Sequence, residues 1–160
     1  MTTLAGLLQR LEDSALADTI RQSFWLYPAL EIVHIVGIVL LVGAAFLFDL
    51  RLLGFSPAIP VKALAQHLLP WSRRGLYLIL PSGILLFSTN AVALSVDPVF
   101  HVKMIALGAG LVNAGIFQLL LYPSSSGWVQ KGIPASAKII AMLSMLVWLL
   151  VISCGRLLAY

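Results

Sequence analysis

Long apolar stretches alternate with short polar connections along most of this 160-residue chain. Four of these stretches come close to the roughly 20 apolar residues with which a helix crosses a bilayer. They cover residues 27–50, 74–95, 98–122 and 136–158. Because lipid offers the backbone no hydrogen-bond partner, runs of this length predict helices. We therefore expect an all-α integral membrane protein whose residues 25–160 form a four-helix bundle.

The segment before the first stretch, residues 1–24, follows a different pattern. Its apolar residues recur at helical spacing from Leu4 to Ile20, with charged and amide residues between them. This periodicity is typical of an amphipathic helix lying on a membrane surface. Asp13 or Ser14 could cap a second short helix after a break. We expect this interfacial segment to act as an anchor or a lid.

Four spans would place both termini and the connection between spans two and three on one face, here called side A. The opposite face is side B. Side B receives six Lys and Arg residues and one acid, Asp49, whereas side A receives four cations and five acids. Asp49 and Arg51 are expected to mark the side B interface. The positive-inside rule then puts side B in the cytoplasm and both termini in the periplasm of a multi-pass protein of the bacterial inner membrane.

Composition supports a membrane protein and narrows its chemistry. The chain is 61% hydrophobic and 10% charged, whereas soluble domains carry about 25% charged residues. The Lys and Arg residues behind its net charge of +4 border the spans, so this charge does not indicate nucleic-acid binding. The single cysteine, Cys154, excludes an intrachain disulfide. Cys154 and Trp148 are predicted to pack inside the bundle, and Asn113 to form an interhelical hydrogen bond.

Two histidines begin alternate stretches at similar depths. His34 follows the start of the first stretch and His101 the start of the third. In an antiparallel bundle these two helices run the same way, and each histidine lies roughly 30 Å from the side B end. Two neutral imidazoles facing each other are an axial ligand set for haem iron, and four-helix bundles bind cofactors between facing helices. We predict one haem b per chain, ligated by His34 and His101.

Residues near these histidines fit the same hypothesis. Glu31, three residues before His34, could accept the hydrogen bond of the non-ligating ring nitrogen. Gly37 and Gly108 lie on the histidine-bearing helices and could give room to the edge of the macrocycle; close helix packing is the alternative reading. A carboxylate-bridged dimetal site would need a second Glu-x-x-His motif, which the chain lacks.

The propionates of a haem would need cations on side A. Lys103 is two residues from His101, Arg156 ends the fourth stretch and Arg21 precedes the first. Arg156 is the preferred candidate because it lies at a helix end on this side. Snorkelling to lipid headgroups is the alternative for Lys103.

The third histidine, His67, lies towards side B and cannot share an iron with the other two. It needs no function there, although a second haem could use it as a ligand. Because no other histidine lies on that side, Met142, Met145 or an oligomeric partner would have to supply the second ligand. A homo-oligomer therefore stays open.

Several motifs carry a family resemblance: WLYPALEIVHIVGIVLLVG with DLRLLG, then QHLLPWSRRG, FHVKM and the terminal GRLLAY. From Trp25 onwards the chain resembles an uncharacterised family of bacterial four-span membrane proteins that carry a domain of unknown function. More distantly it looks like four-helix membrane cytochromes b and the related copper-resistance membrane proteins. The resemblance implies haem binding by histidines of different spans and electron transfer with quinol and partner proteins. Only His34 and His101 correspond to haem-binding histidines of those cytochromes, because this chain does not match their usual set of four.

These observations favour a membrane cytochrome b that passes electrons near the periplasmic face. Its partners would be the bilayer and a quinone or periplasmic redox protein. If the chain is an enzyme it is a membrane oxidoreductase, although an iron with two histidine ligands has no free position for oxygen chemistry. One alternative is a small transporter or channel component whose His34, Glu31 and His101 handle protons or a copper ion, copper being bound by His101 and Met104 with His34. Another is a structural subunit of a membrane complex.

Overall fold

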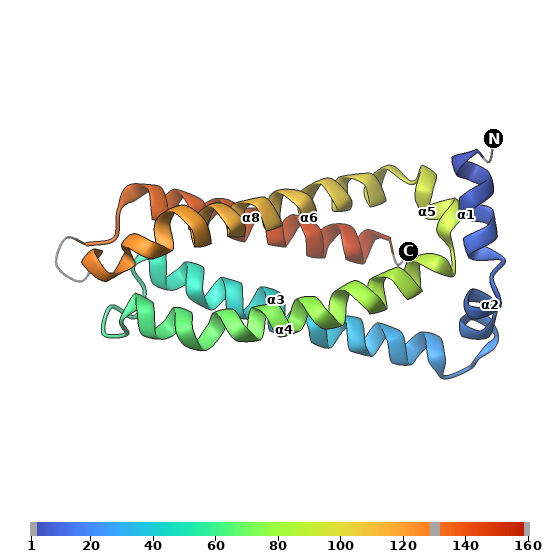
Figure 1. The fold of residues 1–160 in the computed structure, drawn as a ribbon, viewed down its shortest axis with the longest axis horizontal. Helices are drawn as coiled ribbons and strands as arrows, with labels where there is room; N and C mark the ends of the chain where they lie inside the picture. Colours follow the sequence, from blue (N-terminus) through green and yellow to red (C-terminus); the bar gives the residue numbers. More distant parts are fainter. Residues whose placement is uncertain (1–2, 129–131, 159–160) are drawn as a thin grey trace.

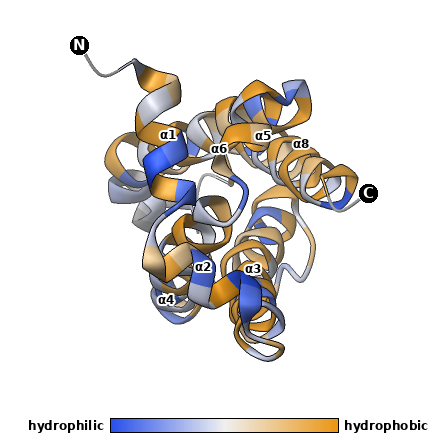
Figure 2. Cartoon of the chain, turned by 90° about the vertical axis from the view of Figure 1, so that its right-hand side faces the viewer, coloured by the Kyte–Doolittle hydropathy of each residue, from blue (hydrophilic) through white to orange (hydrophobic). Residues whose placement is uncertain are grey.

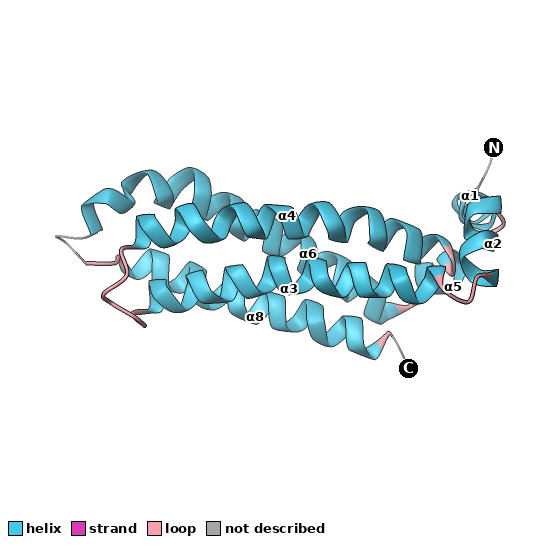
Figure 3. Ribbon diagram, turned by 90° about the horizontal axis from the view of Figure 1, so that it is seen from below, coloured by secondary structure: helices cyan, strands magenta, loops and turns pink. Residues whose placement is uncertain are grey.

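The computed structural model describes residues 3–128 and 132–158, and every regular element in them is a helix (Figure 3). The elements are α1 (Leu4–Glu12), α2 (Ala15–Gln22), α3 (Leu26–Leu53), α4 (Val61–Ser88), α5 (Ala91–Val96), α6 (Pro98–Ile116) and α8 (Ala135–Leu157). After α6 the chain continues through a π-helical turn, η1 (Phe117–Leu121), into a 3-10 segment, η2 (Tyr122–Gly127). Lys131, one of the side B cations, and the final residues of the GRLLAY motif lie outside the described residues.

Four long antiparallel helices, α3, α4, α6 and α8, run the length of the molecule (Figure 1). The two termini and the α4–α5–α6 connection gather at one end, which is side A. Helices α1 and α2 lie across this end. The all-α prediction is therefore confirmed, and so is an N-terminal helical segment at the side A end.

Three of the long helices have the length and apolar composition to cross a membrane: α3, α6 with its π-helical extension, and α8. They indicate a multi-pass membrane protein. Helix α4 is as long, but Arg73 and Arg74 lie near its middle. The prediction for this region was wrong in its bounds. The helix already begins at Val61, includes the segment 61–69, and ends at Ser88 rather than at residue 95.

The early end of α4 has a local cause. The Ser88 hydroxyl donates to the Leu85 carbonyl at 2.7 Å, and the Thr89 hydroxyl donates to the Leu86 carbonyl at 2.7 Å. Such bonds alone do not end a helix, since Ser82 makes the same kind of bond inside α4; the helical conformation is lost at Asn90, with φ −150° and ψ 43°. The chain turns at Asn90 and begins the short helix α5.

Packing within the bundle is uneven. Helices α3 and α4 meet at two glycines, and a Cβ at Gly75 would lie 2.5 Å from the Leu41 nitrogen and 2.6 Å from the Gly37 carbonyl oxygen. Helix α6 packs on α8, and α8 on α3, whereas α4 and α6 make little direct contact. Seen from side A, α3 and α6 lie on opposite corners of the bundle (Figure 2). The bundle is two helical hairpins joined mainly through α3 and α8.

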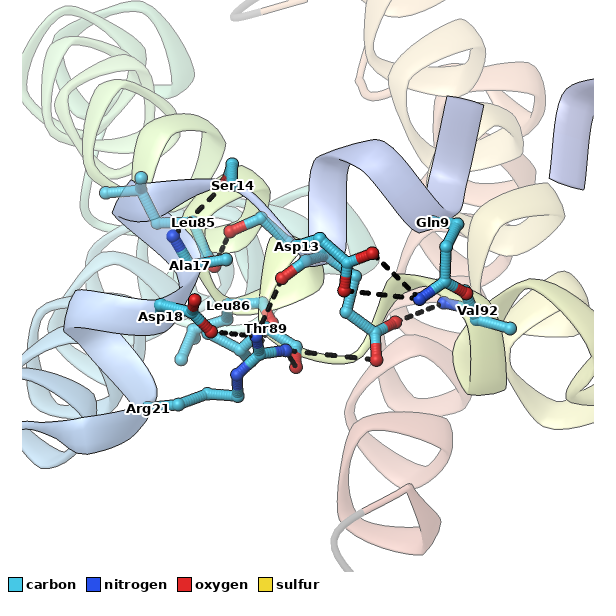
Figure 4. A network of polar contacts seen from close by, with 12 residues as sticks. Gln9, Asp13, Ser14, Ala17, Asp18, Arg21, Leu85, Leu86, Thr89 and Val92 are labelled. Carbon is cyan, nitrogen blue, oxygen red and sulfur yellow. Dashed lines mark hydrogen bonds and ion pairs between the residues drawn. The ribbon is translucent and has the colours of Figure 1, made fainter. Parts of the chain in front are cut away.

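The N-terminal helices are fixed to the side A end by a polar network (Figure 4). The Ser14 hydroxyl caps α2, accepting from the Ala17 N–H at 3.3 Å. The Arg21 guanidinium donates to the Thr89 carbonyl at 3.2 Å, and Glu12 accepts the Val92 N–H at 2.8 Å. These bonds hold α1 and α2 over the α4–α5 turn and confirm the predicted cap at Ser14.

Candidate functional site

His34 is half-buried on α3 and faces α4. Its Nδ1 atom lies 2.9 Å from the Ser82 hydroxyl oxygen. Gly83 provides the room, because a Cβ there would lie 3.2 Å from Cε1 of the ring.

The bonds of Ser82 determine the tautomer of His34. The Ser82 hydroxyl donates its hydrogen to the Leu78 carbonyl at 2.6 Å. With its hydrogen committed, the oxygen can only accept from His34, so Nδ1 carries the ring proton. The Nε2 atom then keeps its lone pair, which is the form that a metal binds.

His101 also carries its ring proton on Nδ1, but its hydrogen-bond partner is a backbone carbonyl. It is exposed in the first turn of α6, and its Nδ1 lies 2.8 Å from the Asp97 backbone carbonyl. A carbonyl can only accept, so Nδ1 carries the proton and Nε2 keeps its lone pair. The turn is held by Asp97, whose carboxylate accepts from the Val99 N–H at 2.7 Å and the Phe100 N–H at 3.3 Å.

Contacts with α4 relate the depths of the two histidines. The His34 ring lies against Gly83. One turn further along α4, Phe87 stacks on Phe100, the neighbour of His101, with centroids 5.3 Å apart. The two histidines therefore lie in the side A half and within about one helical turn (~5 Å) of each other in depth.

The other predicted site residues, Glu31, Gly37 and Gly108, differ in exposure and contacts. Glu31 is exposed, and the hydrogen-bonding partner of His34 is Ser82, so the predicted Glu31 bond is wrong. Gly37 packs on α4, where a Cβ would lie 2.8 Å from Ile79. This contact favours the packing explanation for Gly37. Gly108 is exposed, with no atom within 4 Å of a built Cβ.

The predicted cations also differ from one another. Lys103 is half-buried and extends inward, with its Nζ 3.8 Å from a Cβ built on Gly155. It lies close enough to His34 for electrostatic interaction. Arg156 is exposed near the end of α8. Arg21 is engaged by Asp18 and by the network at the α4–α5 turn.

His67 is exposed on α4, in the half of the bundle opposite to the other two histidines. Among the described residues, no group of three or more His, Cys, Asp and Glu side chains could hold a metal ion.

Asp49 is the residue that sequence reasoning missed. Predicted at the side B interface, it is only 6% exposed and lies inside the bundle. Arg51 stays at the border, where it donates to the Ile59 carbonyl at 2.6 Å and to that of Pro57 at 3.2 Å. An acid within a span was the available signal.

The packing predictions for three interior residues are confirmed. The Asn113 amide donates to the Ile140 carbonyl on α8 at 3.3 Å. Trp148 and Cys154 are each 4% exposed.

The model of a family of unknown function, DUF6644, matches residues 19–160. The chain belongs to this family. The match covers the whole bundle and begins within α2, in agreement with the predicted resemblance to a family that carries a domain of unknown function. Nothing in it links the family to cytochromes b. No curated protein and no solved structure matches the chain.

Proposed function

We propose that the chain binds one haem b through His34 and His101 and transfers electrons near side A. The observation that supports this proposal is the shared state of the two imidazoles. Each ring donates from Nδ1 to a fixed oxygen, of Ser82 or of Asp97, and keeps the Nε2 lone pair. Metal-ligating histidines nearly always have this arrangement, because the outer hydrogen bond orients the ring and increases its basicity.

Two neutral imidazoles are the donors that a haem iron takes as its two protein ligands. The rings come from helices on opposite corners of the bundle, and α4 and α6, which complete this half, make little direct contact. Lys103, half-buried beside His34, and Arg156 on α8 are the cations that would pair with propionates. The Gly37 side, where α3 meets α4, is closed by packing.

A haem bound here would supply a one-electron Fe(III)/Fe(II) couple. The chain's residues would hold it rather than react. Ser82 and the Asp97 carbonyl fix the two rings, and the half-buried position of His34 limits access of water. Because histidines occupy both axial positions, the arrangement favours electron transfer, with a quinol or a periplasmic redox protein as the partner class.

Spectroscopy of the purified protein tests this proposal. A reduced-minus-oxidised spectrum should show sharp b-type bands. His34→Ala and His101→Ala should each abolish haem retention, whereas His67→Ala, an exposed histidine in the other half, should retain it. Full haem content in either of the first two variants would refute the assignment.

Two other results would replace this function. A colourless wild-type protein that retains copper would support copper handling by His34, His101 and Met104. A protein with neither haem nor copper would support a structural subunit. The same preparation and metal analysis distinguish all three outcomes.

A further inference from the structure

A second polar region lies inside the bundle, in the side B half. A partly open cavity of about 130 Å³ lies between α3, α4, α8 and the α6–η1 segment. Most of its wall is apolar, but polar side chains converge on it from all of these elements. They are Asp49, Ser72, Arg73, Asn113, Gln118 and Ser144.

Asp49 is incompletely satisfied in this cavity. The Ser144 hydroxyl of α8 is its hydrogen-bonding neighbour. Its Oδ2 atom, however, is the one buried side-chain nitrogen or oxygen of the described residues that has no hydrogen-bond partner. A buried polar atom without a partner costs free energy. Asp49 is thus a carboxylate that lines the cavity while one of its oxygens is buried without a partner.

The cavity adjoins a groove that lies towards side B. This groove, of about 300 Å³, lies between α4 and the η1–η2 segment, and Gln66 and Tyr122 line it. Three residues, Leu69, Arg73 and Gln118, line both the groove and the cavity. Gln118 belongs to the π-helical turn, a feature often found at functional sites. Polar side chains therefore extend from the groove to Asp49.

The charges around Asp49 decide which ligand fits. An ionised carboxylate without a cationic partner is expensive in a low-dielectric interior. Of the described residues, none of the ion pairs includes Asp49. Arg73 of α4 is the one charged group of the wall besides Asp49; α6 and η1 contribute Asn113 and Gln118, and α8 contributes Ser144, all neutral. Arg73 disfavours any added positive charge, a metal cation as well as a proton, but one proton neutralises the carboxylate without the several further oxygen ligands that a metal cation needs.

We propose that Asp49 is a proton-exchange site that opens to side B through the groove. A hydronium ion from side B gives its proton to the carboxylate, which becomes a carboxylic acid, and a water molecule is released. The reverse step returns the proton to the same side. This proposal does not depend on haem binding, since it rests on residues of the other half of the bundle.

Carbodiimide labelling tests the site, because dicyclohexylcarbodiimide adds to protonated carboxyl groups in apolar surroundings. The full chain is placed in vesicles of known orientation, and the pH is changed on one side at a time. The label should appear at Asp49 and disappear when side B is made alkaline, with no response to side A. Asp49→Asn should lose the label, and Asp49→Glu should retain it and report that the fold is intact. Glu31→Gln, which removes an exposed carboxyl from the same helix, should leave the labelling unchanged.

Three results would overturn the proposal. One is an unlabelled wild-type Asp49 at acidic pH on both sides. Another is labelling that follows the pH of side A. The third is protection by sodium ions at constant pH, which would assign the cavity to a metal cation instead.

Discussion

Two ionisable side chains of helix α3, His34 and Asp49, lie in opposite halves of the bundle, and their surroundings differ. His34 is only half-buried, yet Ser82 holds its ring. Asp49 is almost fully buried, yet one of its oxygens has no partner. A positioned ring suits a group that holds a ligand in one geometry. An unpartnered oxygen suits a group that gains and loses a ligand.

This comparison depends on α3 keeping its register against α4. Gly75→Ala should disturb both halves, because the new Cβ would lie 2.5 Å from the Leu41 backbone nitrogen. Overpacking of this kind costs about 3 kcal/mol, and backbone atoms cannot move aside as a flexible side chain can. Thermal unfolding in detergent measures the loss. Gly43→Ala is the matched control, because no atom lies within 4 Å of its Cβ. Equal stability of the two variants would contradict the close contact.

Ser82→Ala tests the surroundings of His34 alone. It removes the acceptor of His34 Nδ1 and should lower haem affinity about 10–100-fold, the usual effect of losing a metal ligand's hydrogen-bond partner. Haem titration of the purified protein gives the affinity. Ser88→Ala removes another buried hydroxyl of α4, one that bonds only to the Leu85 carbonyl, and should change the affinity little. An equal loss in both variants would mean that Ser82 supports the helix and not the ring.

Asp49→Asn tests the surroundings of Asp49 and has the smallest expected effect. The substitution keeps the shape and removes the charge of a group whose oxygen lacks a partner. It should raise the stability by about 1 kcal/mol, since an ionised carboxylate without an ion-pair partner destabilises a buried site. Thermal unfolding of the haem-free protein measures this change without interference from a ligand. A clear loss of stability would show that the carboxylate has a stabilising partner in the folded protein.

Much of the fold could be predicted because it depends on local rules. Apolar length predicted the long helices, and Ser14 and the left-handed Gly54 mark helix boundaries by their own chemistry. The end of α4 could not be predicted in this way. Its apolar run continues past Ser88, and the turn at Asn90 interrupts it although no proline or glycine marks the position.

The site was harder to predict because its partners come from distant parts of the chain. The residue types suggested His34 and His101, but Ser82 is separated from His34 by 48 positions. The two meet only because Gly37 and Gly75 set how α3 crosses α4. Asp49 was misplaced for a related reason. Counting apolar residues does not give the rotation of a helix, and that rotation turns Asp49 inward while Arg51 reaches the loop.

The π-helical turn after α6 makes the orientation of side chains in one half of the bundle independent of that in the other half. A π turn is wider than an α turn, since its hydrogen bonds join residues five apart rather than four. One extra residue changes the angular setting of everything beyond it by roughly 100°. The segment that bears His101 can therefore keep its orientation while the side chains following Phe117 are aimed independently. Deleting a single residue from this turn would rotate the two segments relative to one another. The lining of the cavity around Asp49 would then change, although His34 and His101 stayed in place.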